Sequence, residues 1–318
     1  MLRLKKANPE DAYAEWKYVT ETPSDENGFT NSWSGCSYEQ FVSEAIPWMQ
    51  KYERGEDLPE GHVPEVFYFL WHDDKVVGEF RVRCQLTDAL RHGAGHIGYA
   101  IARDEREKGY GSEGLRLTLQ EAAHLVKEEE FYLRVRRNNP ASLRIMQKNG
   151  GRIVGEDAEC FFVRIMNPAA VVIAEEEISK ENEVVLIELS NDWTEENSCY
   201  GYRPNTHEDL SGRRLFTARY QGKMIGYLFG IIETASRTDS IRREGERFFE
   251  IEELYILPQY RSLGIGRRLY QACAKGVQRE ADLIMLSTAT KDWKKILHFY
   301  IEEMGMDFWS ARLFQRLK

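Results

Sequence analysis

The sequence predicts an α/β protein of two domains that follow one plan, and three observations lead to this prediction. A glycine turn of the form R-x-x-G-x-G occurs twice, at 106–111 and at 261–266. Around each turn the chain reads as a hairpin, a strand, the turn, a helix, a strand, a helix and a strand. The 318 residues suit two domains of about 150 residues each. The matching order indicates duplication or fusion of one fold.

The first half begins with a helical stretch and a polar loop over 20–35, followed by strand-like apolar patterns. The strands that these patterns predict are 66–72, 75–83, 96–102, 131–136 and one that ends near Arg164. Residues 115–126 carry apolar side chains at helical spacing, which predicts a helix directly after the turn. Residues 138–140 open a second, shorter helix that carries Ser142.

The second half repeats this order, with a long polar insertion over 234–247 and a helix over 293–304. The strands predicted there are 184–189, 214–220, 223–232, 248–257, 283–287 and 308–317. Between the halves, 167–183 contains a run of glutamates, which is typical of a solvated connector. We therefore predict domains at 1–166 and 184–318, joined by a linker at 167–183.

The glycine turns indicate binding of a phosphate group. Glycine lets the backbone turn tightly and approach a ligand closely. A helix that begins directly after such a turn presents free N–H groups and its positive dipole end to an anion. A nucleotide P-loop does not fit, because no G-K-[ST] follows, and a Rossmann fingerprint does not fit, because the third glycine is missing. Two copies therefore predict two pyrophosphate sites.

Composition narrows the class of protein further. The formal net charge of −9 argues against nucleic acid as a partner, because phosphate binding needs a basic surface. The charge is compatible with a cationic substrate. No segment approaches the roughly 20 apolar residues that span a bilayer, and the first residues lack the apolar stretch of a secretory signal. Five cysteines without a C-x-x-C pair fit a reduced, cytoplasmic protein.

In both halves the chain resembles the GNAT superfamily of N-acetyltransferases. The family signature is a strand, a Q/R-x-x-G-x-G/A turn and a helix, and both turns match it in residues and context. The stretches that carry the resemblance are 95–119 and 138–151 in the first half, and 250–270 and 298–306 in the second. The resemblance implies two GNAT domains, each with a mixed, mostly antiparallel sheet flanked by helices.

The resemblance also implies acetyl-CoA as co-substrate, with its pyrophosphate on the backbone N–H groups of each turn, and no metal. The residues expected to bind acetyl-CoA are Tyr99, Ala100, Ile101, Arg106, Lys108, Gly109, Tyr110, Gly111, Ser112, Asn139, Ser142, Leu254, Tyr255, Ile256, Arg261, Leu263, Gly264, Ile265, Gly266 and Arg267.

Acetyl transfer to an amine requires a polarised thioester carbonyl, an amine that loses a proton and a thiolate that gains one. The resemblance implies Glu250 and Glu252 as candidate bases and Tyr300 as candidate acid. On a regular strand Glu250 and Glu252 share a face and Glu253 points the other way, and a bulge would change this. Tyr300 stands five positions before Gly305, where four is common in the family.

Each of these groups also has a structural interpretation, as ion-paired carboxylates or a packed aromatic ring. The first half departs from the family pattern, because Met146 stands where the family tyrosine would fall. The strand before the first turn offers only His96, and Glu79 and Arg81 are the nearest other charged residues. We therefore expect the second half to be the more competent catalyst.

The predicted function is N-acetyltransfer from acetyl-CoA to the amine of a small acceptor, which could be cationic. The alternative is an acyl-CoA-binding sensor or scaffold in which one or both sites have lost catalysis. A narrower alternative is acetylation of a protein N-terminus or lysine. The segments expected to shape the acceptor site, 20–64 and 193–213, carry no motif that names the acceptor.

Overall fold

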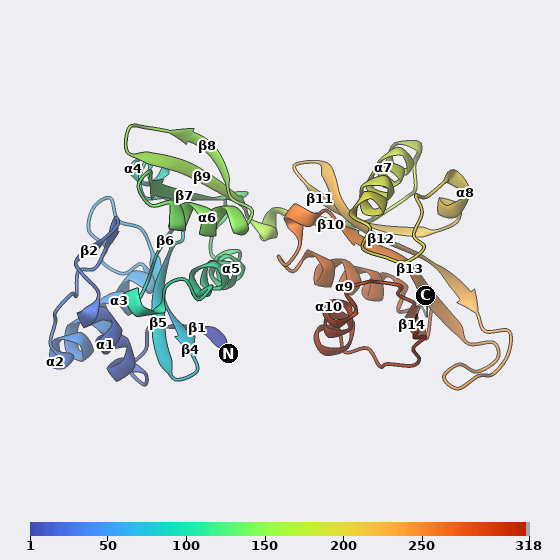
Figure 1. The fold of residues 1–318 in the computed structure, drawn as a ribbon, viewed down its shortest axis with the longest axis horizontal. Helices are drawn as coiled ribbons and strands as arrows, with labels where there is room; N and C mark the ends of the chain where they lie inside the picture. The colour runs from blue at the N-terminus through green and yellow to red at the C-terminus, as the bar shows by residue number, and fades with distance from the viewer. Residues whose placement is uncertain (316–318) are drawn as a thin grey trace. The chain divides into compact units, whose positions relative to one another are not determined.

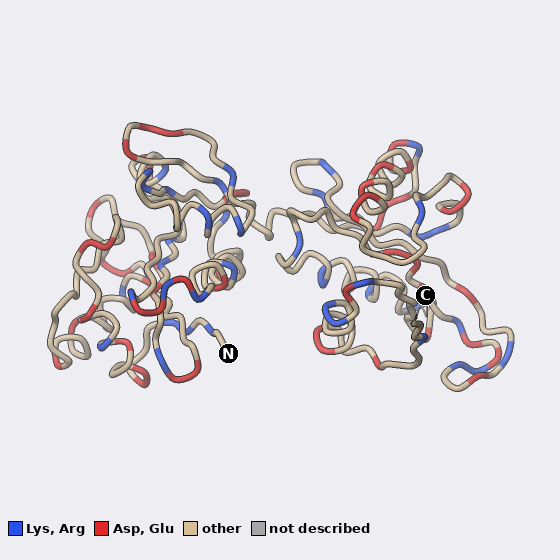
Figure 2. Tube along the Cα trace, viewed as in Figure 1, with Lys and Arg blue, Asp and Glu red and all other residues tan. Residues whose placement is uncertain are grey.

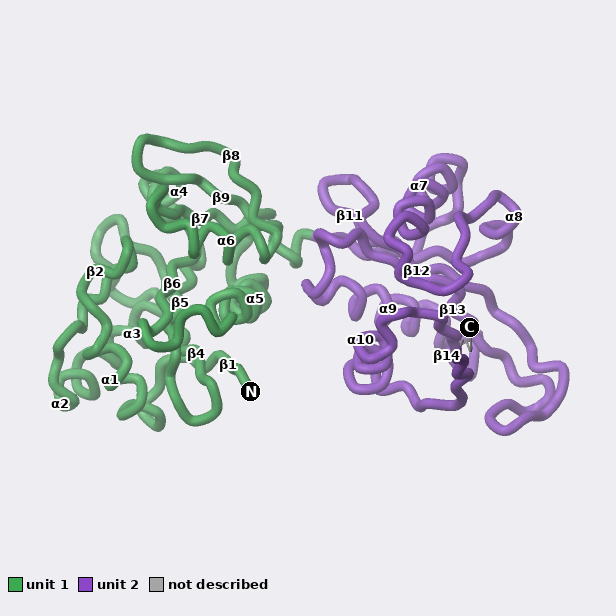
Figure 3. The backbone as a smooth tube through the Cα atoms, in the orientation of Figure 1, with its two compact units in different colours: residues 1–170 green, residues 171–318 purple. Residues whose placement is uncertain are grey.

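The computed structural model describes residues 1–315. The chain forms two compact units, Met1–Ala170 and Val171–Lys318, which we call unit 1 and unit 2 (Figure 3). Each unit contains a mostly antiparallel sheet with helices packed against it (Figure 1). This arrangement confirms the predicted fold class.

Unit 1 is built on a sheet with strand order β1-β4-β5-β6, which is antiparallel throughout. Its strands are β1 (Leu2–Lys6), β2 (Asp25–Glu26), β3 (Phe29–Thr30), β4 (Glu65–His72), β5 (Lys75–Arg83), β6 (Ile97–Ile101), β7 (Glu130–Arg136), β8 (Arg152–Glu156) and β9 (Cys160–Met166). Its helices are α1 (Ala12–Glu21), α2 (Tyr38–Gln40), η1 (Phe41–Ala45), α3 (Ile46–Arg54), α4 (Asp88–Arg91), η2 (Arg103–Glu105), α5 (Tyr110–Ala122), α6 (Pro140–Lys148) and η3 (Pro168–Ala170).

The two faces of this sheet carry separate apolar cores. Leu115 and Leu119 of α5 pack with Phe80 on one face, where all three side chains are fully buried. On the other face Tyr18 of α1 and Met49 of α3 pack against β4 and β5. The hairpin β2–β3 lies in the segment expected as a polar loop, and β1 was not expected.

A second sheet of unit 1, with order β7-β9-β8, lies beside β6 without continuous pairing. The two sheets meet at an isolated bridge between Gly95 and Leu133. A Cβ at residue 95 would lie 2.1 Å from the Tyr132 carbonyl oxygen, so only glycine permits this approach. Beyond the bridge β6 and β7 diverge, which leaves a gap between their remaining residues.

Unit 2 holds one five-stranded sheet with order β10-β11-β12-β13-β14, in which only β13 and β14 are parallel. Its strands are β10 (Val172–Glu176), β11 (Arg214–Tyr220), β12 (Lys223–Thr234), β13 (Arg247–Ile256) and β14 (Leu283–Leu286). Its helices are α7 (Lys180–Glu196), α8 (His207–Leu210), η4 (Pro258–Tyr260), α9 (Ile265–Val277), α10 (Trp293–Leu297) and η5 (His298–Glu303).

One segment of the second half that was expected as a strand is a helix. Residues 184–189 belong to the helix α7 rather than to a strand: Ser179 caps its N-terminus, and acidic residues begin it (Figure 2). The expected linker 167–183 also has regular structure. Val172–Glu176 pairs antiparallel with β11, where Glu176 binds Arg219 at 2.8 and 2.9 Å. The ion pair explains how a glutamate in a charged run lies within the sheet.

The expected strand 308–317 has no counterpart in its described part, because 308–315 has no regular structure. Its last two residues lie outside the described residues. No helix described over 1–315 is long and apolar enough to cross a bilayer.

The assignment of α7 predicts a large difference between two neighbouring aliphatic residues. Leu186 is fully buried, whereas Val184 is 57% exposed. Leu186→Ala should lower the free energy of unfolding of unit 2 by about 2–5 kcal/mol, because it leaves a cavity. Val184→Ala should change it by less than about 0.5 kcal/mol. Urea unfolding measures the free energy for both variants. Equal losses of stability would contradict the helix and support a strand, since a strand places 184 and 186 on one face.

Candidate functional site

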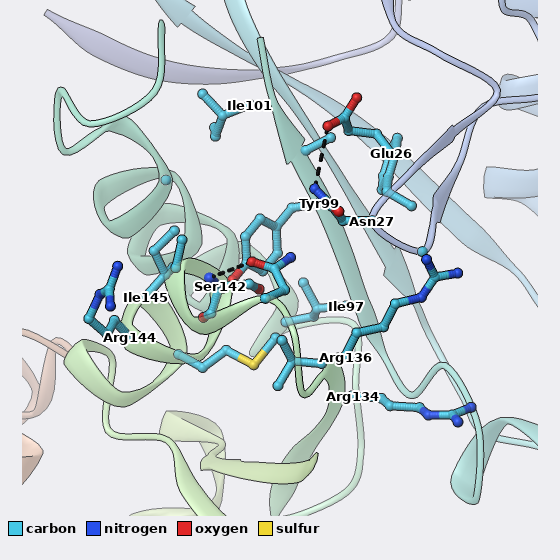
Figure 4. Close-up of a pocket in the computed structure, with 18 of the residues that line it drawn as sticks. Glu26, Asn27, Ile97, Tyr99, Ile101, Arg134, Arg136, Ser142, Arg144 and Ile145 are labelled. Atoms are coloured by element: carbon cyan, nitrogen blue, oxygen red, sulfur yellow. Dashed lines mark hydrogen bonds between the residues drawn. The ribbon is translucent and has the colours of Figure 1, made fainter. Parts of the chain in front are cut away.

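A cavity of about 730 Å³ lies in unit 1 where β6 and β7 diverge. The β2–β3 hairpin, the first turn of α5 and helix α6 complete its walls (Figure 4). The expected cofactor residues that line it are Tyr99, Ala100, Ile101, Arg106, Gly109, Gly111, Ser112, Asn139 and Ser142. Lys108 and Tyr110 are not brought to the cavity: Lys108 pairs with Glu105 at 2.8 Å, and Tyr110 packs against His72.

The glycine turn of unit 1 presents a helix N-terminus to this cavity. Gly109 has φ 84°, a left-handed conformation that favours glycine, and it occupies the N-cap position of α5. No side chain caps this helix. Its first N–H groups are therefore donors for an anion, and Gly111 and Ser112 of the first turn line the cavity.

Arg106 fixes the turn rather than extending freely into the cavity. Its Nε donates to the Ile101 carbonyl at 3.1 Å, and its Nη2 donates to Glu26 at 2.9 Å. Arg103 donates to the same carboxylate at 3.0 Å. Burial alone would raise the pKa of Glu26, but the hydrogen bonds from Arg106 and Arg103 outweigh it and lower that pKa. Glu26 is thus a charged anchor that joins the β2–β3 hairpin to the turn.

Two hydroxyl groups lie together in the cavity. The Tyr99 hydroxyl and Ser142 Oγ are 2.8 Å apart, one from β6 and the other from α6 (Figure 4). Asn139 Oδ1 accepts a hydrogen bond from the Ser142 N–H at 3.1 Å, which caps α6 and fixes Ser142. Burial raises the pKa of Tyr99, so its hydroxyl keeps its proton. Met146 also lines the cavity and carries no proton to donate.

His96, Glu79 and Arg81 lie outside the cavity. His96 is fully buried at the closed end of the divergence, where its Nδ1 accepts from the Tyr132 N–H at 2.9 Å. Burial lowers the pKa of His96 to about 4, despite the nearby Glu128. Glu79 and Arg81 form a buried pair at 2.6 Å, and Arg81 also donates to the Thr30 carbonyl at 2.8 Å. These groups hold strands and the β2–β3 hairpin in place.

The turn of unit 2 is built in the same way. Gly264 has φ 77° and stands at the N-cap of α9, which also lacks a side-chain cap. Arg261 Nε donates to the Ile256 carbonyl at 2.7 Å, and its Nη2 donates to Glu196 at 2.8 Å. Ile256 ends β13 as Ile101 ends β6. Each arginine thus joins its turn to a strand end and to a glutamate from the N-terminal part of its own unit.

The other expected cofactor residues of unit 2 lie in different surroundings, on β13, in the core and at the start of α9. Leu254 and Tyr255 lie on β13, where the Tyr255 hydroxyl donates to Glu196 at 2.6 Å. Ile265 is buried in the core, and Arg267 pairs with Glu303 at 2.9 Å. Leu263 and Gly266 flank the N-terminus of α9, and Phe299 of η5 lies beside Gly266.

A bulge in β13 decides which carboxylates share a face. The pairing with β12 passes from Phe229↔Glu253 to Gly230↔Ile251, so Glu252 has no partner across the ladder. Since Ile231 pairs with Glu250, the bulge places Glu250 and Glu253 on one face of the sheet.

The three carboxylates therefore have different surroundings. Glu252 is bound by both nitrogens of Arg213, each at 2.8 Å. Glu250 is half-buried, and burial raises its pKa, with a further contribution from Glu233. Glu253 is 9% exposed and accepts hydrogen bonds from the Tyr227 hydroxyl at 2.7 Å and from Asn205 at 3.0 Å. Burial raises the pKa of Glu253, and these hydrogen bonds offset part of the effect.

Glu253 is the residue that sequence reasoning underrated. It is the most enclosed of the three carboxylates and directly precedes the strand segment expected at the thioester. The signal that could have found it is the close spacing of three acidic residues in the sequence of one strand, because a bulge there changes which of them share a face.

Tyr300 lies in η5, a π-helical turn over His298–Glu303. The Met304 N–H donates to the Phe299 carbonyl five residues earlier, at 3.0 Å. A π-helical turn holds one residue more than an α-helical turn. It therefore absorbs the extra position between Tyr300 and Gly305. Burial raises the pKa of Tyr300, and Tyr270 of α9 lies close by.

Among residues 1–315 no group of three His, Cys, Asp or Glu side chains could hold a metal ion. The five cysteines are free thiols, and Cys160 lies in the wall of the unit 1 cavity.

Comparison with known families assigns both halves. The sequence model of the acetyltransferase (GNAT) domain matches residues 2–152, and that of the acetyltransferase (GNAT) family matches residues 182–306. The chain belongs to the GNAT acetyltransferases. It carries two GNAT domains in tandem, and membership assigns it to acetyltransferases that use acetyl-CoA. No curated protein sequence matches the chain.

Solved structures similar to this GNAT chain include an aminoglycoside acetyltransferase from an uncultured soil metagenomic sample, in complex with sisomicin. It is 16% identical, covers 47% of this chain and 97% of its own, and has a TM-score of 0.36. A ribosomal-protein-alanine N-acetyltransferase from Brucella melitensis biovar Abortus 2308 is 16% identical. It covers 46% of this chain and 99% of its own, with a TM-score of 0.34. A GNAT acetyltransferase from Streptococcus pneumoniae is 19% identical. It covers 52% of this chain and 99% of its own, with a TM-score of 0.37.

The turn geometry predicts how Gly109→Val acts on acetyl-CoA binding. Valine resists a positive φ, so the turn must change its backbone and misplace its N–H groups. We expect the affinity of unit 1 for acetyl-CoA to fall about tenfold or more. Gly61→Val is the matched control, because Gly61 also has positive φ and open space around its Cβ position but lies outside the cavity. Calorimetric titrations that are identical for the two variants would contradict the assignment.

Proposed function

We propose that this chain is an N-acetyltransferase that moves the acetyl group of acetyl-CoA to a primary amine of a small acceptor. In the transfer the thioester C–S bond breaks and a C–N bond forms. The amine loses a proton and the leaving thiolate gains one. Each unit holds one pyrophosphate at its own glycine turn.

The unit 1 cavity is the observation that carries this proposal. It joins an uncapped helix N-terminus to a pair of hydroxyl groups inside one space of about 730 Å³. That volume lies in the range of small-molecule and cofactor sites. The first feature suits the pyrophosphate, and the second suits a reacting group at the other end of the same ligand.

In unit 1 the Tyr99–Ser142 pair is the proposed acid. Ser142 is held by Asn139 and can donate a hydrogen bond to the leaving thiolate while the Tyr99 hydroxyl, which keeps its proton, donates to Ser142 Oγ. The proton that the thiolate finally takes balances the one that the amine loses. This pair would supply what the family tyrosine supplies elsewhere, at the place where this chain has Met146.

In unit 2 we assign the base to the shared face of Glu250 and Glu253, with Glu253 as the principal candidate. Its buried carboxyl has a raised pKa, which brings it toward the range useful for a base. Glu252, which was predicted as a base together with Glu250, forms an ion pair with Arg213. We keep Tyr300 as the proposed acid of unit 2.

The alternative function is an acyl-CoA-binding module without turnover. The anchored turns of both units favour it, because they would bind the cofactor regardless of the acid and base. Incubation of the chain with acetyl-CoA and a panel of amines distinguishes the two functions. Release of free thiol that depends on the amine supports the transferase, and calorimetric binding without thiol release supports the module.

The proposed acid of unit 1 predicts a selective effect of Ser142→Ala. In a chain that also carries Glu253→Gln, so that turnover comes from unit 1, loss of the donor should lower kcat by about 100-fold, with the KM for acetyl-CoA nearly unchanged. Ser112→Ala is the control, since Ser112 also lines the cavity but belongs to the turn. Steady-state rates with a thiol reagent measure both variants. An unchanged kcat in Ser142→Ala would remove this pair from the chemistry.

The proposed base of unit 2 predicts the pH dependence of the rate. The carboxylate acts in its deprotonated form, so kcat/KM should rise with pH through the raised pKa of Glu253 and level off above it. In a chain that also carries Ser142→Ala, so that turnover comes from unit 2, Glu253→Gln should remove this rising limb and lower kcat/KM about 100-fold. Glu252→Gln, which breaks only the pair with Arg213, should keep the limb. Superimposable profiles for the parent and Glu253→Gln would refute the assignment.

A further inference from the structure

Two arginines of β7 occupy one side of the unit 1 cavity. Phe131, Leu133 and Val135 point into the core that packs on α5. Because side chains alternate along a strand, Arg134 and Arg136 point to the opposite face. Figure 4 shows both side chains extending away from Ser142, and that of Arg136 reaches toward the β2–β3 hairpin. Gly28 of this hairpin lies beside Arg136, because a Cβ added at Gly28 would lie 3.2 Å from Arg136 Nε.

Both guanidinium groups retain capacity for a ligand. Arg134 Nη2 is 3.4 Å from Asp157, and Arg136 Nη2 is 3.4 Å from Asp25. These separations are long for charge-assisted hydrogen bonds, which are typically about 2.7–2.9 Å. The Nε of Arg134 is buried and has no hydrogen-bond partner. A buried donor without a partner is costly, so the Arg134 side chain would be stabilised by a shift that brings this nitrogen to an acceptor.

The side chains that line the cavity include more cationic than anionic groups, although Asp157 and Asp25 offset part of the charge of the two arginines. Glu26 already receives hydrogen bonds from Arg103 and Arg106. Glu159, which also lines the cavity, is exposed at its rim. The hydroxyl pair proposed as the acid lies at the other side, so the arginines face the space in which an acceptor would approach the thioester.

We propose that unit 1 selects amine acceptors that also carry an anionic oxygen group, a carboxylate or a phosphate, and that Arg134 and Arg136 bind this group. The proposal rests on the proposed acetyl transfer and names its acceptor class in unit 1. The planar guanidinium groups match the paired oxygens of a carboxylate or phosphate. A purely cationic amine would be repelled at the same place.

Matched acceptors of similar length test the selection. The probes are 3-aminopropanoate, O-phosphoethanolamine, neutral 3-aminopropanamide and cationic 1,3-diaminopropane, each with acetyl-CoA and the full chain carrying Glu253→Gln, which removes the proposed base of unit 2. We expect kcat/KM to be highest for one or both anionic amines, and their ratio tells whether carboxylate or phosphate is preferred. Equal use of the neutral amide, or preference for the diamine, would overturn the proposal.

Arg134→Gln and Arg136→Gln test the residues. Each should raise the KM for the preferred anionic amine roughly 10- to 100-fold, while the KM values for acetyl-CoA and for 3-aminopropanamide stay the same. Arg137→Gln is the control, because it removes the same charge from a residue that pairs with Glu156 and stacks on Phe161 outside the cavity. If both variants keep the preference for the anionic amine, other residues bind the anionic group, and the role of these arginines is refuted.

If no amine is acetylated, the proposed transfer fails and the selection is measured by binding. Calorimetry then titrates 3-aminopropanoate and 3-aminopropanamide into the full chain saturated with CoA. Binding of the anionic amine alone, weakened in Arg136→Gln but not in Arg137→Gln, supports the anion site without catalysis. Equal binding of both amines, or of neither, overturns it.

Discussion

Both units depend on one constraint: two neighbouring strands are held together at one end and diverge at the other. In unit 1 the closed end requires Gly95, whose missing side chain allows close approach to the Tyr132 carbonyl, and His96, whose ring accepts a hydrogen bond from the Tyr132 N–H. In unit 2 the parallel pairing of β13 and β14 runs only as far as Ile251 and Leu286. Past these points the two strands are no longer paired with each other, although β13 continues to pair with β12 as far as Ile256. In unit 1 the cavity of about 730 Å³ lies where the two strands diverge.

The glycine turn follows the diverging strand directly, and its shape depends on an arginine that does not need the ligand. Arg106 and Arg261 each bind the last carbonyl of that strand and a glutamate, Glu26 or Glu196. Sequence motifs place such an arginine next to the phosphate site, whereas the contacts show it setting the backbone. The first N–H groups of the following helix, which no side chain caps, remain available as donors.

Local features were predictable from the sequence, and features that depend on distant contacts were not. The hairpins and the turns come from short patterns, so they were predicted within a few residues. The strand expected at 184–189 was wrong because its run of valine, leucine and isoleucine has high β propensity, while helical burial of Leu186 and Leu189 decides the structure. The choice between Glu252 and Glu253 depends on a bulge set by Gly230 of the neighbouring strand, where a Cβ would lie 2.1 Å from the Glu250 carbonyl. No pattern along β13 alone records that contact.

The separate anchoring of the two turns has an evolutionary consequence. After a gene duplication, a copy that shares a structural support with its twin must change in step with it. Here Glu26 supports the turn of unit 1 and Glu196 that of unit 2. Each unit can then vary the side chains of its later helix, Met146 in unit 1 and Tyr300 in unit 2, without a change in the turn of the other unit. Selection can therefore divide the labour between the copies, with one tuned for turnover and the other for recognition.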